Sequence, residues 1–196
     1  MPTACVLYAG FEFAESGRAV ERYLKQRGYT VMLQDIGDSA TFAMIRKPPG
    51  GCDVSVWLSH GGWDGPLIWQ QNGGGDAGWG QIDPVETPRE WRKLQQFMST
   101  FMKPDGLVIT HACHSAGSNR WESKEGPLGE RWAQQLARDM KLYTTGVLGS
   151  TASANHKWAV EFVRYSLDGG RYSYQPAHAY RPGGAREQAW RGWANR

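Results

Sequence analysis

The chain has 196 residues, enough for one α/β domain to bury a sizeable core without metal ions or disulfide staples. Its 22 Lys and Arg and 19 Asp and Glu residues give a net charge of +3. These charges are scattered, so no basic stripe indicates nucleic acid. The 40% of hydrophobic residues excludes general disorder, and the longest apolar runs are too short to cross a membrane.

The three cysteines, Cys5, Cys52 and Cys113, are an odd number without paired spacing. We therefore expect reduced thiols instead of a disulfide framework, with Cys5 and Cys52 as small buried apolar residues. The N-terminal sequence MPTACVLYAGFEFAE has no basic start and carries Glu12, which is unlike a Sec signal peptide. The expected location is the cytoplasm, or outside the cell after export without such a signal.

Apolar runs alternate with stretches of helical period in the first half of the chain. Residues 4–10, 30–36 and 52–62 are predicted as strands, and the first is nearly continuously apolar, as in a strand buried on both faces. A helix is predicted over residues 15–28, ended by glycine. A shorter helix is predicted over residues 39–46, before two prolines.

The same alternation continues to residue 151. Residues 65–75 are predicted as a hairpin with a glycine-rich tip, and residues 87–103 as an amphipathic helix with proline in its first turn. That helix stops at a Pro-Asp-Gly sequence. A strand over residues 106–113, a helix over 127–141 and a strand over 144–151 follow. This order predicts a three-layer α/β sandwich, with a mostly parallel sheet of five to six strands flanked by helices.

The pattern weakens beyond residue 151. Residues 157–165 partly alternate and are predicted as an edge strand, and residues 171–184 as irregular. No linker divides the chain, so we expect one domain over residues 1–196, with a core of 4–151 and a C-terminal extension of 152–196 packed on it. Aromatic residues of the extension either cover the sheet edge or bind a protein partner. They are Tyr172, Tyr174, Tyr180, Trp190 and Trp193.

Chemically useful side chains follow two of the predicted strands. His60 and Gly61 lie at the carboxyl end of the third strand, and Cys113 ends the fourth. In an open α/β sheet, ligands gather at the carboxyl ends of the strands. A cysteine thiolate is a nucleophile, and a nearby histidine can deprotonate it and then protonate a leaving amine. The N–H groups of Gly61 and Cys113 are candidate donors to an oxyanion.

These two motifs carry a family resemblance. A strand ending in His-Gly (VSVWLSHGG), followed by a helix and a strand ending in Ala-Cys (GLVITHACHSAG), resembles the caspase-like cysteine peptidases of clan CD. The spacing of about 50 residues from the histidine to the cysteine agrees with the known caspase signature. The resemblance covers residues 4–151 and is closest to the looser bacterial clostripain, gingipain and CHAT-like types.

The resemblance implies a caspase-like fold and cleavage of a peptide or protein substrate without a cofactor. It implies His60 as general base and acid, and Cys113 as nucleophile. The chain departs from caspases at His111, where caspases have glutamine, and at His114 and Ser115, where caspases have a glycine-containing motif. The substrate preference of caspases is therefore not transferred to this chain.

In that family, loops after the first, second and fifth strands line the pocket for the residue before the scissile bond. The matching positions are Glu12, Asp35 or Asp38, and the segment from Ser150 to Asn155. We add His111 to this set. Acidic groups in the pocket favour a basic substrate residue. The alternative is that Glu12 and Asp35 are solvated or paired with arginines.

Two other functions are compatible with the same residues. The domain can serve as a binding or scaffold module that keeps the fold without activity. His111, Cys113 and His114, together with His60, can instead form the zinc site of a hydrolase, since thiolate and imidazole suit zinc. The peptidase hypothesis itself predicts no metal ligands.

Overall fold

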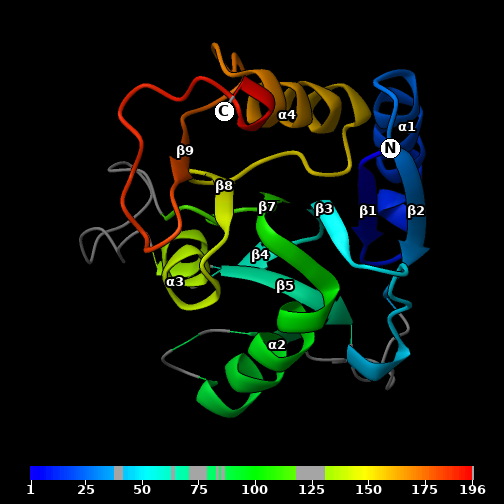
Figure 1. Cartoon of the computed structure of the whole chain (residues 1–196), viewed down its shortest axis with the longest axis vertical. Helices are drawn as coiled ribbons and strands as arrows, with labels where there is room; N and C mark the ends of the chain where they lie inside the picture. Colours follow the sequence, from blue (N-terminus) through cyan, green and yellow to red (C-terminus); the bar gives the residue numbers. More distant parts are fainter. Residues whose placement is uncertain are drawn as a thin grey trace.

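The computed structural model describes residues 1–37, 42–62, 65–70, 79–82, 84, 87–117 and 131–195, with the backbone alone at 62, 65–70, 79–81 and 131. Within these residues, a sheet of six strands runs in the order β2-β1-β3-β7-β8-β9 (Figure 1). The first five are parallel and β9 is antiparallel to β8. The strands are β1 (Thr3–Tyr8), β2 (Thr30–Asp35), β3 (Cys52–Leu58), β7 (Met102–His111), β8 (Tyr143–Val147) and β9 (Ala177–Tyr180).

Helices cover both faces of this sheet (Figure 1). On one face, α1 (Ala14–Gln26) and α4 (His156–Asp168) pack over one apolar cluster, and on the other α2 (Pro88–Phe101) and α3 (Arg131–Met140) pack over a second. A small second sheet of β4 (Gly61–Gly62), β5 (Gly65–Gln70) and β6 (Trp79–Gln81) follows β3. The predicted three-layer α/β arrangement, with a mostly parallel sheet of six strands, is confirmed.

Residues 157–165 are not an edge strand, because they lie inside helix α4. The Asn155 side chain begins this helix by accepting hydrogen bonds from the N–H groups of Lys157 and Trp158. The buried positions recur at helical spacing. The residues between them give part of the segment the alternating pattern that is typical of a strand. The buried positions are Ala159, Phe162, Val163, Tyr165, Ser166 and Leu167.

Three other boundaries differ from the prediction. In place of a helix over 39–46, the described part holds a short 3-10 turn, Phe42–Met44. Strand β7 begins at Met102 instead of 106. The Pro-Asp-Gly sequence lies inside the strand at an irregularity, where the pairing with β3 shifts and Asp105 takes a positive φ of 57°. The segment predicted as irregular contributes β9, which is the antiparallel edge strand.

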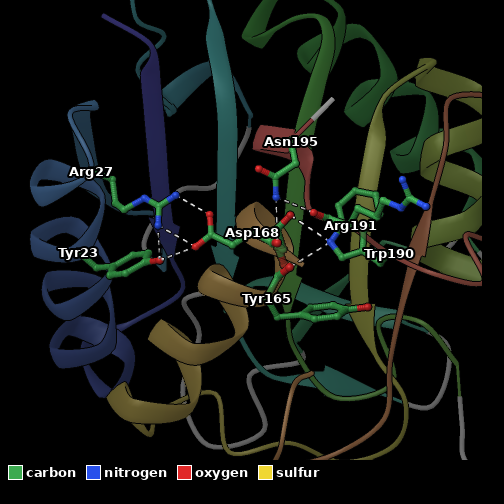
Figure 2. A network of polar contacts seen from close by, with 8 residues as sticks. Tyr23, Arg27, Tyr165, Asp168, Trp190, Arg191 and Asn195 are labelled. Carbon is green, nitrogen blue, oxygen red and sulfur yellow. Dashed lines mark hydrogen bonds and ion pairs between the residues drawn. The ribbon is translucent and has the colours of Figure 1, made fainter. Parts of the chain in front are cut away.

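The C-terminal extension is fastened to the end of α4 (Figure 2). The Trp190 indole N–H donates to the Tyr165 carbonyl at 3.0 Å, and the Asn195 amide donates to the Asp168 carbonyl at 3.1 Å. The Asp168 carboxylate in turn accepts two hydrogen bonds from Arg27 of α1. Helix α4 is therefore tied to both α1 and the chain's last residues.

Most of the aromatic side chains of the extension cover the sheet. Tyr172, Tyr180 and Trp190 are buried, whereas Tyr174 is exposed and stacks on Trp158. Of the two alternatives for these aromatic residues, covering the sheet is confirmed for the three that are buried. Binding of a protein partner remains a prediction for the exposed part of the segment.

The structure corrects the expectation of three reduced thiols. Cys5 of β1 and Cys52 of β3 form a disulfide, and Cys113 is the free cysteine. Both bonded cysteines are fully buried, as expected, but they are not thiols. Their separation of 47 residues in the chain does not indicate pairing, and the two come together only because β1 and β3 are neighbours in the sheet.

We expect thiol titration of the unfolded protein to detect one thiol per chain without reductant and three after reduction. In a chain-entropy estimate, a crosslink of this loop length stabilises the fold by about 3–4 kcal/mol. Replacing both Cys5 and Cys52 with alanine should therefore lower the urea midpoint clearly, while Cys113→Ala should not. Three thiols in the unreduced protein would contradict the disulfide.

Candidate active site

The pairing of β3 with β7 determines the position of the candidate site. The two strands are parallel neighbours, and Leu58 lies opposite His111 in their register. His60 and Cys113 each follow two residues later, at the carboxyl ends of the same two strands. The two predicted catalytic residues therefore leave the sheet at equivalent positions on one edge.

Gly61 keeps these two chain segments in direct contact. A Cβ atom built on Gly61 would lie 1.9 Å from the carbonyl oxygen of Cys113 and 2.7 Å from its nitrogen. No side chain fits there, because the neighbouring atoms belong to the backbone and cannot rotate away. The N–H groups predicted to hold an oxyanion therefore belong to two backbone segments that touch.

His60 lies at the surface beside Glu12. Its side chain is 45% exposed, and its Nε2 atom is 2.8 Å from Oε1 of Glu12. The ring also packs edge-on against Phe13, with the ring centres 5.0 Å apart. Because a carboxylate only accepts hydrogen bonds, this contact places a proton on Nε2 of the neutral ring and leaves Nδ1 as the basic nitrogen.

The sulfur of Cys113 is held by the backbone of one residue, Thr151. The Thr151 N–H donates to Sγ at 3.2 Å, and the thiol donates to the Thr151 carbonyl at 3.4 Å. Within the described residues, the hydrogen bonds of this sulfur are with Thr151 and not with His60. Thr151 lies four residues after β8, inside the segment 150–155 predicted to line the substrate pocket, but its contact with the sulfur was not predicted.

His111 is fully buried and does not line a substrate pocket, which corrects the prediction for this residue. Its ring packs against Phe162, and its Nε2 atom lies 3.1 Å from both the Tyr172 hydroxyl and the Thr151 hydroxyl. Burial lowers the pKa of His111 to about 3, so the ring is neutral near pH 7. Tyr172 comes from the C-terminal extension, and no sequence motif pointed to it.

The other predicted pocket residues are separate from one another. The Asp35 carboxylate accepts hydrogen bonds from the N–H groups of Gly10 and Gly37 and so fastens the loops after β1 and β2. Glu12 is engaged with His60, and neither acid is paired with arginine in the hydrogen bonds and ion pairs described. Ser150 is exposed, next to Thr151. Asp38 lies outside the described residues.

The predicted zinc cluster does not form in the part of the chain that the structure describes. No three His, Cys, Asp or Glu side chains there gather as metal ligands do. The Nε2 atom of His111 faces two hydroxyl groups, and Sγ of Cys113 faces a backbone segment. The donor atoms of these two residues are therefore not arranged around one ion.

No model of a known protein family matches the chain, and no curated protein matches its sequence. Within the described residues, no helix has the length and the apolar character to cross a membrane. The interpretation of the site therefore depends on its own geometry and chemistry.

The burial of His111 predicts a specific loss of stability in acid. The unfolded histidine binds a proton below pH 6.5, whereas the folded one does so only near pH 3. The free energy of unfolding should therefore fall as the pH drops from about 6.5 toward 3, by up to ~1.4 kcal/mol per pH unit from this residue. When urea midpoints are plotted against pH, the midpoint of His111→Gln should therefore fall less steeply in acid than that of the wild type.

The matched control is His156→Gln, which removes a histidine that is 44% exposed. Its acid slope should follow that of the wild type. Equal slopes for the wild type and His111→Gln would show that His111 is not held neutral by burial.

Proposed function

We propose that the protein is a cysteine endopeptidase of the caspase-like type that acts through His60 and Cys113. The observation that carries the proposal is the delivery of both residues to one sheet edge by neighbouring parallel strands, with Gly61 packed on the Cys113 backbone. A reactive thiol, a histidine and two backbone N–H groups together are suited to acyl transfer. The substrate class is a peptide or protein.

In the first step, Nδ1 of His60 takes the proton from Sγ of Cys113. The thiolate attacks the carbonyl carbon of the scissile bond, and the C=O electron pair moves onto the oxygen. The N–H groups of Gly61 and Cys113 donate to this oxyanion. Sγ first gives up its hydrogen bond to the Thr151 carbonyl, so the thiol turns toward His60 when substrate binds.

In the second step, the His60 imidazolium gives its proton to the leaving nitrogen as the C–N bond breaks. Glu12 stabilises the imidazolium and orients the ring through Nε2. A thioester between the substrate acyl group and Cys113 remains. Water then attacks this thioester while His60 accepts the water proton, and Sγ leaves and recovers the proton. The sequence of steps requires no cofactor.

The alternative is a scaffold or binding module with the same fold. It is favoured by one observation, that the Cys113 thiol donates to Thr151. Because Cys113 is the free cysteine, iodoacetamide labelling reports on it alone. Faster labelling at neutral pH than that of a thiol in a short unstructured peptide supports the peptidase, and slow labelling supports the scaffold.

The disulfide bears on where this activity takes place. Such bonds persist in oxidising compartments and are rare in the cytosol of most organisms. Of the two expected locations, cytoplasm and outside the cell, the buried Cys5–Cys52 bond favours export.

A positional-scanning peptide library tests the activity and its specificity together. We expect Cys113→Ala to abolish cleavage with little change in the urea midpoint, because the alanine removes the nucleophile and only its two sulfur hydrogen bonds with Thr151. His60→Gln should lower kcat/KM by roughly 10²- to 10⁴-fold. The control, His156→Gln, removes another exposed histidine that is paired with a glutamate and should leave activity unchanged. Cleavage by Cys113→Ala would refute the proposal.

Glu12→Gln should lower kcat about five- to tenfold, because an exposed pair of this kind contributes on the order of 1 kcal/mol to holding the imidazolium. Its effect should fall in 1 M salt, where exposed charges are screened. Glu15→Gln is the matched control, since Glu15 pairs with His156 in the same way. Equal kcat values for the two variants would remove Glu12 from the mechanism.

A further inference from the structure

A buried polar network lies directly beneath the candidate nucleophile. His111, the last residue of β7, is fully buried and packs between Phe162 of α4 and Tyr172 of the C-terminal extension. Its Nε2 atom is 3.1 Å from the hydroxyls of Tyr172 and Thr151. Three elements of the fold therefore meet at one ring nitrogen.

Thr151 connects this network to the sulfur of Cys113. Its side-chain oxygen faces inward to His111, while its backbone N–H and carbonyl both contact Sγ, at 3.2 and 3.4 Å. His111 and Cys113 are also only two residues apart, at the end of the same strand. The residue that hydrogen-bonds with the sulfur, Thr151, is therefore itself held by a buried side chain, His111.

A histidine at this buried position is costly to the fold. In the described part of the chain its Nδ1 atom has no hydrogen-bond partner, and burying a polar atom without a partner destabilises a fold. An apolar side chain would pack against Phe162 without that penalty. We therefore assign to the hydrogen bonds of His111 a role that packing alone would not serve.

His111 does not exchange protons with Cys113. Burial lowers its pKa to about 3, so it stays neutral over the range in which a thiol is deprotonated by a histidine. Its hydrogen bonds reach the Thr151 side chain, and the Thr151 backbone reaches the sulfur. Its effect on the nucleophile is therefore exerted through position.

Resting on the proposed peptidase function, we propose that His111 and Thr151 are positioning residues that fix the Cys113 sulfur for attack. His111 anchors the Thr151 hydroxyl, and the N–H of the anchored Thr151 supports Sγ at the end of β7, also after the thiol has left the Thr151 carbonyl. Without the anchor, the segment after β8 shifts and the sulfur is presented in several positions. The loss then appears in kcat, because substrate binding by other residues is unaffected.

The first test removes one hydroxyl. Thr151→Val has nearly the same shape, but it loses the hydrogen bond to His111, so kcat on the best library peptide should fall roughly five- to tenfold with KM within about twofold. Thr151→Ser keeps the hydroxyl and should restore kcat. Tyr165→Phe is the matched control, since it deletes a hydroxyl from the same aromatic cluster at a side chain outside the network.

His111→Leu and His111→Gln form a second pair. Glutamine can still hydrogen-bond with Thr151 and should keep most of kcat, whereas leucine should behave like Thr151→Val. Urea midpoints measured alongside show that each variant is folded. If His111→Leu does not fold, the comparison of Thr151→Val with Thr151→Ser decides the question alone.

Labelling of Cys113 with iodoacetamide separates this inference from the peptidase proposal, because it needs no substrate. In Thr151→Val the hydrogen bond to His111 no longer holds the N–H of residue 151 in place, so labelling should slow by a factor similar to the fall in kcat. Thr151→Ser and Tyr165→Phe should label at the wild-type rate. Wild-type labelling by Thr151→Val refutes the positioning role. Equal losses in all three variants also refute it. A wild type that labels as expected but cleaves no peptide refutes the peptidase function alone.

Discussion

The parallel pairing of β3 with β7 is the constraint on which the candidate site depends. Their register sets Leu58 opposite His111, so the two residues that follow each strand bring His60 and Cys113 to equivalent places. Side chains on both faces of β3 hold this register, with Val56 in one apolar cluster and Trp57 in the other. A slip by one residue would exchange these two faces, and a slip that brings residue 60 to the place of Gly61 would also press a side chain against the Cys113 backbone.

The C-terminal extension also supports the candidate site. Gly169 and Gly192 allow the backbone of the extension to lie against the end of α4, where Cβ atoms would come within 2.4 and 2.3 Å of backbone atoms. Between these glycines the chain supplies β9 to the sheet and Tyr172 to His111. The segment that looked least ordered in sequence therefore completes both the edge of the sheet and the support beneath the site.

The central strands and the amphipathic helices α1 and α2 could be predicted because each buries a long apolar pattern of one period. The placement of His60 and Cys113 at one sheet edge was predicted on the condition that their two strands are neighbours, and the pairing of β3 with β7 meets that condition. Helix α4 could not be distinguished in this way, since Ser166 and Tyr165 interrupt its apolar face. The Ser166 hydroxyl is satisfied by the Phe162 carbonyl of the same helix and by Thr145 of β8. The disulfide, the Glu12–His60 contact and the Tyr172–His111 contact join residues distant in sequence, and no local spacing encodes such contacts.

His60 and His111 have opposite environments, and this contrast fits the different roles proposed for them. His60 is nearly half exposed and has a carboxylate at Nε2, so water and Glu12 can both accommodate a positive charge on the ring. His111 is sealed among aromatic rings with only hydroxyl groups as partners, so a charge there would have no compensation. A ring that gains and loses a proton in each cycle needs the first environment. A ring that must keep the same hydrogen bonds throughout the cycle needs the second, because any change in its charge would rearrange the hydroxyls that hold Thr151.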